Sequence, residues 1–170
     1  MKGTAENNTQ ATAQQLSNSL SRLLREISRD FEHRIWRGLA ARGYPDTRPS
    51  HGVVFANLGS QGIRVTELAA RARVTQQAMG KMLKELERLG YVTREVDRGD
   101  KRAKEIRLTE RGTALAADNV AVASEVRAYY ADLIGTRLLE DLEGNLRQAV
   151  GKLRINNLPE VWSLTSRLER

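Results

Sequence analysis

The sequence predicts a mainly α-helical protein that contains one small antiparallel β-hairpin. Over most of its 170 residues, apolar side chains recur at intervals of three and four, which places them on one face of a helix. Residues 91–108 differ, because two short runs rich in β-forming residues flank a turn-forming segment there. The order of these patterns predicts a compact central unit of short helices and a hairpin, with longer helices before and after it.

The first predicted helix begins at Leu16 and is about 25 residues long, since no glycine or proline interrupts its pattern before Gly38. Its apolar stripe consists of Leu16, Leu20, Leu23, Leu24, Ile27, Phe31 and Ile35. Residues 1–15 are polar and lack this periodicity, so we expect them to form a tail outside the fold. A helix of this length extends past a small core, so part of its stripe needs a partner surface.

The next segments are shorter. A loop that contains glycine and proline, residues 41–49, precedes a short helix that begins at Pro49 and ends near Leu58. An extended piece follows at residues 63–65, and Thr66 is the expected N-cap of the next short helix. These elements introduce the part of the chain that carries the strongest functional pattern.

A second amphipathic helix is predicted for residues 76–89, after a tight connection at Val74 and Thr75. Its expected buried face consists of Met79, Met82, Leu83, Leu86 and Leu89. Gly90 follows the last apolar position and ends the helix. The two methionines fit this buried face better than they fit a ligand site.

Residues 91–96 and 103–108 are the two predicted strands of the hairpin. Thr109 is the expected N-cap of a long helix that ends at Gly135. A leucine-rich helix over residues 138–153 completes the pattern. This helix and the first one offer more apolar surface than a single small lobe covers, which predicts a second subunit.

The charge of the chain is positive and unevenly distributed. The net charge is +7; residues 71–107 hold eleven Lys or Arg and six Asp or Glu, whereas residues 110–150 hold four and seven. A concentrated positive charge indicates an anionic partner. The absence of cysteine excludes disulfides, thiolate metal sites and cysteine redox sensors. The start lacks the apolar core of a secretory signal, and no apolar run approaches the ~20 residues that span a bilayer, so we expect a cytoplasmic protein without membrane contact.

The short helix, tight turn, amphipathic helix and hairpin between Thr66 and Leu108 together predict a winged helix-turn-helix. A helix fits the major groove of B-DNA, and the residues at its N-terminal end reach base edges. The face opposite the buried methionines and leucines carries glutamine and lysine, which bind adenine, guanine or phosphate. The candidate DNA contacts of this helix are Thr75, Gln76, Gln77, Lys81 and Lys84. The alternative for each is an ordinary solvated surface residue.

The tip of the hairpin is basic. Arg98, Lys101 and Arg102 are candidate DNA contacts, because a cation on a thin hairpin can enter a narrow minor groove. Asp100 lies two residues before Arg102, where its carboxylate can accept from the guanidinium and hold that side chain extended. An ordinary turn aspartate is the alternative for Asp100.

Three motifs resemble the MarR family of regulators: LERLGYVTR at residues 86–94, DRGDKRA at residues 97–103 and LTERG at residues 108–112. The wing motif of that family places its arginine at Arg102 and its partner aspartate at Asp100, whereas Arg98 stands where many members have proline. The resemblance implies a homodimer in which the first and the last two helices intertwine with the second subunit. It also implies two recognition helices in successive major grooves, about 10 base pairs apart.

These patterns divide the chain into three parts. We expect a disordered tail at residues 1–15, a helical dimerisation lobe at residues 16–47 and 110–170, and a winged helix-turn-helix lobe at residues 48–109. Family members often bind small aromatic or phenolic effectors between such lobes, and the tentative pocket residues here are Trp36, His51 and Phe55. Packing in the core or at an interface is the alternative for these three.

The sequence contains little that suggests catalysis. It has no glycine-rich phosphate loop and no nucleophile elbow, and neither histidine, His33 or His51, has a second histidine four residues away. We therefore expect that the protein is not an enzyme and that it holds neither a metal ion nor a cofactor. The predicted function is a sequence-specific regulator that binds a pseudo-palindromic operator in double-stranded DNA, acts as a repressor and is released by a small aromatic effector. The alternatives are a winged-helix protein-interaction module and a DNA-binding regulator without a ligand.

Overall fold

The computed structural model describes residues 19–59, 62–96 and 104–154. Along the chain, long helices precede and follow a group of shorter elements, as the sequence predicts. The elements in chain order are α2 (Leu20–Ala41), α3 (Pro49–Phe55), β1 (Ile63–Arg64), α4 (Val65–Arg71), α5 (Gln76–Arg88), β2 (Val92–Val96), β3 (Lys104–Leu108), α6 (Glu110–Ile134) and α7 (Thr136–Leu153). The mainly α-helical fold with a small antiparallel sheet is confirmed.

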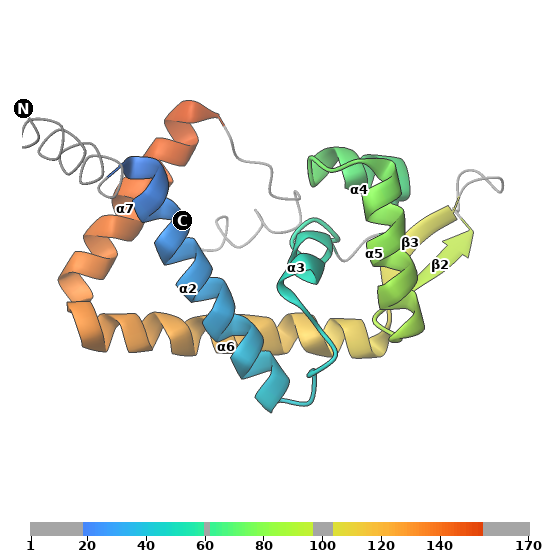
Figure 1. The fold of residues 1–170 in the computed structure, drawn as a ribbon, viewed down its shortest axis with the longest axis horizontal. Coiled ribbons are helices and arrows are strands. Elements are labelled where there is room, and N and C mark those ends of the chain that lie inside the picture. The colour runs from blue at the N-terminus through green and yellow to red at the C-terminus, as the bar shows by residue number, and fades with distance from the viewer. Residues whose placement is uncertain (1–18, 60–61, 97–103, 155–170) are drawn as a thin grey trace, which may run out of the picture.

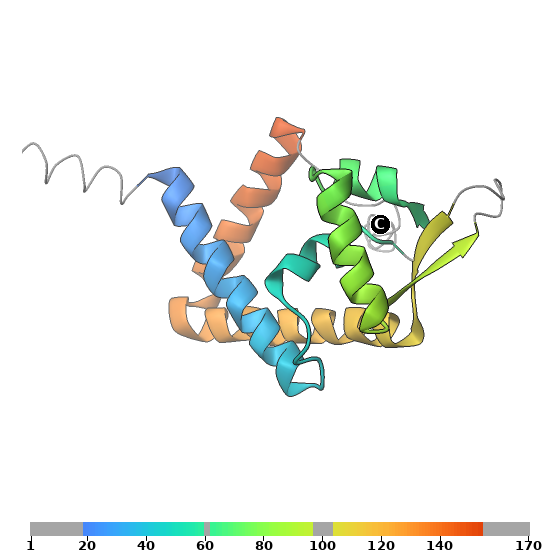
Figure 2. The ribbon, with the colours of Figure 1, turned by 45° about the vertical axis from the view of Figure 1, so that its right-hand side comes forward.

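Helix α6 runs along the length of the molecule and joins two lobes (Figure 1). Helix α2 crosses α6, and α7 lies at the far end of α6 from the sheet. Helices α3, α4 and α5 lie with the sheet at the other end, where Figure 2 shows α5 next to the β2–β3 hairpin. No helix in the described part of the chain has the length and apolarity that crossing a bilayer requires.

The sheet has three strands in the order β1-β3-β2, and both pairs are antiparallel. Val92 lies opposite Leu108, and Ile63 lies opposite Ile106. The side chain of Ile106 is fully buried, so the central strand holds the sheet against the helices. Residues 97–103, the predicted tip of the hairpin, lie outside the described residues.

The predicted N-cap of α4 is wrong. The helix begins at Val65, with Arg64 in the cap position, and Thr66 lies inside its first turn. The physical reason is strand pairing: Ile63 and Arg64 pair with β3, and the chain turns into the helix as soon as that pairing ends. At α6 the expected cap is confirmed, because Thr109 Oγ1 accepts a hydrogen bond from the Gly112 amide at 3.1 Å.

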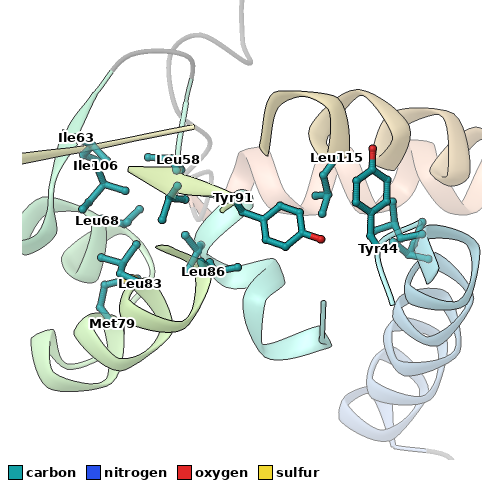
Figure 3. Packing of buried hydrophobic residues seen from close by; sticks show 14 of the residues in the cluster. Tyr44, Leu58, Ile63, Leu68, Met79, Leu83, Leu86, Tyr91, Ile106 and Leu115 are labelled. Carbon is teal, nitrogen blue, oxygen red and sulfur yellow. The ribbon is translucent and has the colours of Figure 1, made fainter. Parts of the chain in front are cut away.

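One core connects the two lobes (Figure 3). At one side it contains the buried face of α5, made by Met79, Leu83 and Leu86. These side chains are buried with apolar residues of α3, α4 and the sheet, and the cluster continues through Tyr91 to Leu115 of α6. Because these residues come from both lobes, the two lobes share one buried core.

Two glycines lie where helix α6 packs closely on other parts of the chain. At Gly112 on α6, a Cβ atom would collide with the backbone carbonyl oxygen of Tyr91, so the start of α6 packs directly on the segment that follows α5. At Gly38 on α2, a Cβ atom would lie 2.5 Å from Cγ1 of Val122, which allows α2 to cross α6 at short range. Neither position tolerates alanine without movement of its neighbour.

Candidate nucleic-acid interface

Helix α5 has one apolar face and one polar face. Met79, Leu83 and Leu86 are fully buried, which fixes the rotation of the helix about its own axis. The predicted contact residues are all exposed: Thr75, Gln76, Gln77, Lys81 and Lys84. Thr75 is also the N-cap, since its Oγ1 accepts from the Ala78 amide at 3.1 Å. The helix therefore presents these polar residues to solvent on a rigid support.

Two further cations of this region were missed by the sequence analysis. Arg88 is exposed at the last residue of α5, four residues after Lys84 and seven after Lys81, so it extends the same face. The spacing of three and four that defines the apolar face also applies to these cations and would have indicated Arg88. Arg73 lies in the turn before α5, is exposed and has a φ of +53°. No periodic pattern indicates a residue in such a turn.

A carboxylate anchors the middle of α5 to α3. Glu85 forms an ion pair with Arg48, and its Oε2 lies 3.3 Å from Nε2 of His51. The imidazole of His51 is completely buried, and its Nδ1 has no hydrogen-bond partner among the described residues. Burial lowers the pKa of His51 below its ordinary value, the nearby Arg48 cation lowers it further, and Asp46 opposes both. His51 is therefore a structural link between α3 and α5.

A second carboxylate anchors the end of α5. The hydroxyl of Tyr91 donates to Asp46 at 2.5 Å, and Arg111 forms an ion pair with the same carboxylate at 3.0 Å. Arg111 also donates to the Leu89 carbonyl at 2.8 Å and lies 4.4 Å from the centroid of the Tyr91 ring. Burial, followed by the bond to Asp46, raises the pKa of Tyr91 to about 12. This cluster fastens the end of α5 to the start of α6 and to the loop after α2.

The predicted contacts at the tip of the hairpin lie outside the described residues. They are Arg98, Lys101 and Arg102, with Asp100 as their predicted support. The strands that lead to them are described, and β2 is tied to α5 by an ion pair between Arg94 and Glu87 at 3.2 Å. The base of the hairpin is therefore fixed beside α5.

Two of the three residues predicted for a ligand pocket line the same cavity. Trp36 and Phe55 line a cavity of about 210 Å³, together with Leu115 and Asn119 of α6. His51 does not line it, because the ring is buried beside Glu85 on α5 instead. The ring of Phe55 meets that of Tyr91 edge-on, with 6.1 Å between their centroids. The cavity therefore lies one side chain away from the cluster that anchors α5.

The described residues contain no group of three or more His, Asp or Glu side chains that could hold a metal ion. The exposed polar face of α5 carries glutamine amides and lysine cations, while Glu85 and Glu87 are paired with arginines. Amides and cations bind anionic or hydrogen-bonding surfaces.

Comparison with known proteins agrees with this geometry. Residues 46–103 match the model of the MarR family. A curated relative, the exopolysaccharide II synthesis transcriptional activator ExpG of Rhizobium meliloti, is 31% identical over 98 residues, which is 58% of this chain and 50% of ExpG. The matched part thus spans about half the length of that relative.

Solved structures of low sequence identity have the same fold. The apo form of MarR from E. coli matches with a TM-score of 0.65 at 20% identity, over 78% of this chain and 97% of that one. A mutant of MepR from S. aureus bound to an oligodeoxyribonucleotide gives 0.55 at 23% identity, over 79% and 98%. CouR from Rhodococcus jostii bound to p-coumaroyl-CoA gives 0.60 at 23% identity, over 79% and 93%.

The buried imidazole predicts a pH dependence of stability. Because the folded-state pKa of His51 lies below its ordinary value of 6.5, the unfolded chain takes up the proton more readily than the fold does. The stability that neutral His51 contributes is present above pH 6.5 and declines as the pH falls below it. We expect the free energy of unfolding to fall between about pH 7 and pH 5, and to fall less in His51→Gln.

His33→Gln, at an exposed position on α2, is the matched control for the chemical change from histidine to glutamine. Chemical denaturation across this pH range measures the effect. Titration of the His51 ring by NMR in the wild-type protein checks the cause without a mutation, and a midpoint above 6.5 would contradict it.

Proposed function

From the premise that the chain carries the winged helix-turn-helix of the MarR family, we propose that it binds double-stranded DNA as a homodimeric transcriptional regulator. The exposed polar face of α5 carries this proposal. In the proposed complex α5 lies in the major groove, and Gln76 and Gln77 at its N-terminal end meet base edges. The hairpin contacts the adjacent minor groove through Arg98, Lys101 and Arg102.

The charges on α5 support a nucleic acid as the partner. Lys81 and Lys84 are exposed, and neither forms an ion pair within the part of the chain that the structure describes. The acidic residues of α5, Glu85 and Glu87, are paired with Arg48 and Arg94. The exposed face of α5 therefore carries uncompensated positive charge. Such a face favours a polyanionic partner, because cations that bind the phosphates of DNA release the counterions condensed there.

The dimer is supported by apolar surface on the other lobe. Exposed leucine, isoleucine, valine and tyrosine side chains lie on α2, α6 and α7, and the largest exposed fractions belong to Leu20, Leu133, Leu138 and Leu153. A groove of about 880 Å³ lies among the same three helices. A contiguous apolar surface of this kind is unusual on a monomer, and a second copy of the chain covers it in our proposal.

The cavity beside Trp36 and Phe55 is the proposed effector site. Its apolar walls suit a small aromatic compound, and Phe55 connects it to Tyr91 at the end of α5. A compound that prefers a different arrangement of the lobes weakens DNA binding by its difference in affinity for the two arrangements. We propose repression that such a compound relieves; the curated relative ExpG is described as an activator, so a reporter gene under the bound promoter decides the sign.

The DNA proposal predicts the behaviour of the two lysines. The double variant Lys81→Ala/Lys84→Ala should bind duplex DNA at least ~10-fold more weakly near 0.1 M salt, with the slope of log affinity against log salt shallower by about one to two. Fluorescence anisotropy with a duplex selected from a randomised pool measures both. Lys152→Ala on α7 is the control and should bind as the wild type does. A wild-type protein that ignores every duplex at low salt would exclude the proposal and favour the protein-interaction module.

The dimer proposal predicts the effect of charge on the apolar surface. Leu133→Glu/Leu138→Glu should convert a particle of two chains into one chain, because carboxylates on this surface lose water when the copies associate. Both side chains are more than half exposed within one chain, so the variant should still fold. Val96→Glu, on β2, changes an equally exposed residue outside this surface and serves as the control. Sedimentation equilibrium distinguishes the two masses; a wild-type single chain at micromolar concentration is the contrary result.

The effector proposal predicts stabilisation by an aromatic acid. In a thermal-shift panel of aromatic carboxylates, at least one compound should raise the Tm of the wild-type protein and lower its DNA affinity by about 5- to 150-fold. Ala116→Leu adds a larger side chain to the wall of the cavity and should abolish the shift. A panel without any shift would favour a regulator that has no ligand, and an equal shift in Ala116→Leu would place the ligand elsewhere.

A further inference from the structure

Arg73, just before the DNA-binding helix α5, and Gly80, within it, are residue types that their local backbone conformations disfavour. Arg73, in the turn before α5, has a left-handed backbone with φ of +53°, a conformation that favours glycine. Gly80, within α5, is a glycine where the helix favours almost any other residue. We propose that Arg73 and Gly80 are positions of contact with the DNA sugar–phosphate backbone, kept at a cost in stability. This inference rests on the proposed function.

Hydrogen bonds of the turn explain the backbone conformation of Arg73, but they do not explain why the residue is an arginine. The tight turn between α4 and α5 fixes the backbone, with the Arg73 amide bonded to the Ala70 carbonyl at 3.1 Å and the Val74 amide to the Ala69 carbonyl at 3.1 Å. The guanidinium is exposed and has no partner among the residues that the structure describes. Nothing within the described residues offsets the cost of arginine in this turn, which glycine would adopt without strain. Arg154 has the same backbone conformation, so it is the place of Arg73 next to α5 that assigns its side chain to the duplex.

The fold does not explain the glycine at position 80 either. A Cβ atom built there meets nothing within 4 Å, whereas one at Gly112 would collide with the backbone of Tyr91. Packing inside the chain therefore requires a glycine at Gly112 and not at Gly80. Glycine in a helix costs stability relative to alanine, and no packing contact offsets that cost at Gly80. Gly144 and Gly151 on α7 are equally open, so it is the place of Gly80 beside the polar face of α5 that assigns its space to the duplex.

The position of Gly80 on α5 indicates which part of the duplex occupies that space. Gln76, Gly80 and Lys84 follow one another at intervals of four, so a gap lies between two long polar side chains. Gly80 is half-buried, at the margin between the core face and the exposed face. A helix in the major groove directs the centre of its exposed face to the bases and its margins to the walls of the groove, which are sugar and phosphate.

Arg73 lies two residues before the N-cap Thr75, at the end of α5 that enters the groove first. A cation there is placed to meet a phosphate of the same duplex. The two positions thus differ in mechanism: Arg73 supplies charge, and Gly80 supplies close approach. The two mechanisms predict different dependences on salt.

The chain supplies a matched control for each position. Gly144 on α7 is also a helical glycine whose Cβ would meet nothing within 4 Å, and it lies outside the DNA-binding lobe. Arg154, at the end of α7, is the other described arginine in a left-handed conformation, with φ of +52°. The same chemical change can therefore be made at the proposed contact and on another helix, α7.

The experiment compares Gly80→Ala with Gly144→Ala, and Arg73→Gly with Arg154→Gly. Thermal unfolding gives the Tm of each full-length variant. Anisotropy titrations over a series of salt concentrations give the affinity and the salt slope, with a duplex that the wild-type protein selects from a randomised pool and with a scrambled duplex of the same length.

Each of the four substitutions should raise the Tm by about 2 °C or more, because each removes an unfavourable backbone choice. Gly80→Ala should weaken binding to both duplexes by roughly tenfold and leave the salt slope unchanged, since a methyl group blocks close approach without loss of charge. Arg73→Gly should also weaken both, with a slope shallower by about 0.9, as loss of one phosphate contact requires. Gly144→Ala and Arg154→Gly should bind as the wild type does.

Wild-type affinity in Gly80→Ala or Arg73→Gly would overturn the inference at that position. A fall in Tm at either would also overturn it, because the residue would then be required by the fold. Weakening of the selected duplex alone would assign the position to base recognition instead of the backbone. A wild-type protein that binds neither duplex would remove the proposed function itself, an outcome that is distinct from normal binding by the variants.

Discussion

The attachment of the end of α5 to the start of α6 is the constraint on which the rest of the structure depends. Tyr91 is fully buried at this junction, and its hydroxyl donates to Asp46 while Arg111 lies over its ring. Gly112 lets α6 pack directly on the backbone of Tyr91. Because one buried cluster holds α5, α6 and the loop after α2, α5 has a fixed orientation relative to the long helix α6.

This attachment gives the proposed regulation a physical basis. Helix α6 extends from the lobe that holds α5 and the sheet to the apolar surface proposed for the dimer. In the proposed dimer, a change in how two copies pack would therefore alter the placement of both α5 helices. Phe55 contacts Tyr91 at one side and lines the cavity at the other. A ligand in the cavity therefore needs to move only one layer of side chains to act on the junction.

Residues that local backbone preference disfavours occur in α5, in α6 and in the turn before α5, for different reasons. Gly112 is a glycine that the packing requires, and its cost in helix stability is offset by the close contact with Tyr91. Gly80 and Arg73 have no such compensation within the described residues. Departures from local preference that the fold does not explain are expected where a protein meets its partner, which is why they mark the DNA-facing surface in our proposal.

The sequence by itself determined the helices, the hairpin, the cap at Thr109 and the exposed face of α5, because periodicity and turn chemistry are local properties. It did not determine the start of α2, which begins at Leu20 after the extended residue Ser19 and not at Leu16. It also did not determine the start of α4, which strand pairing with β3 sets. Only the tertiary structure decided that His51 is buried against Glu85 and that Tyr91 bonds to Asp46, 45 residues away. Such partners depend on how the helices cross, and that geometry follows from the packing of the whole core.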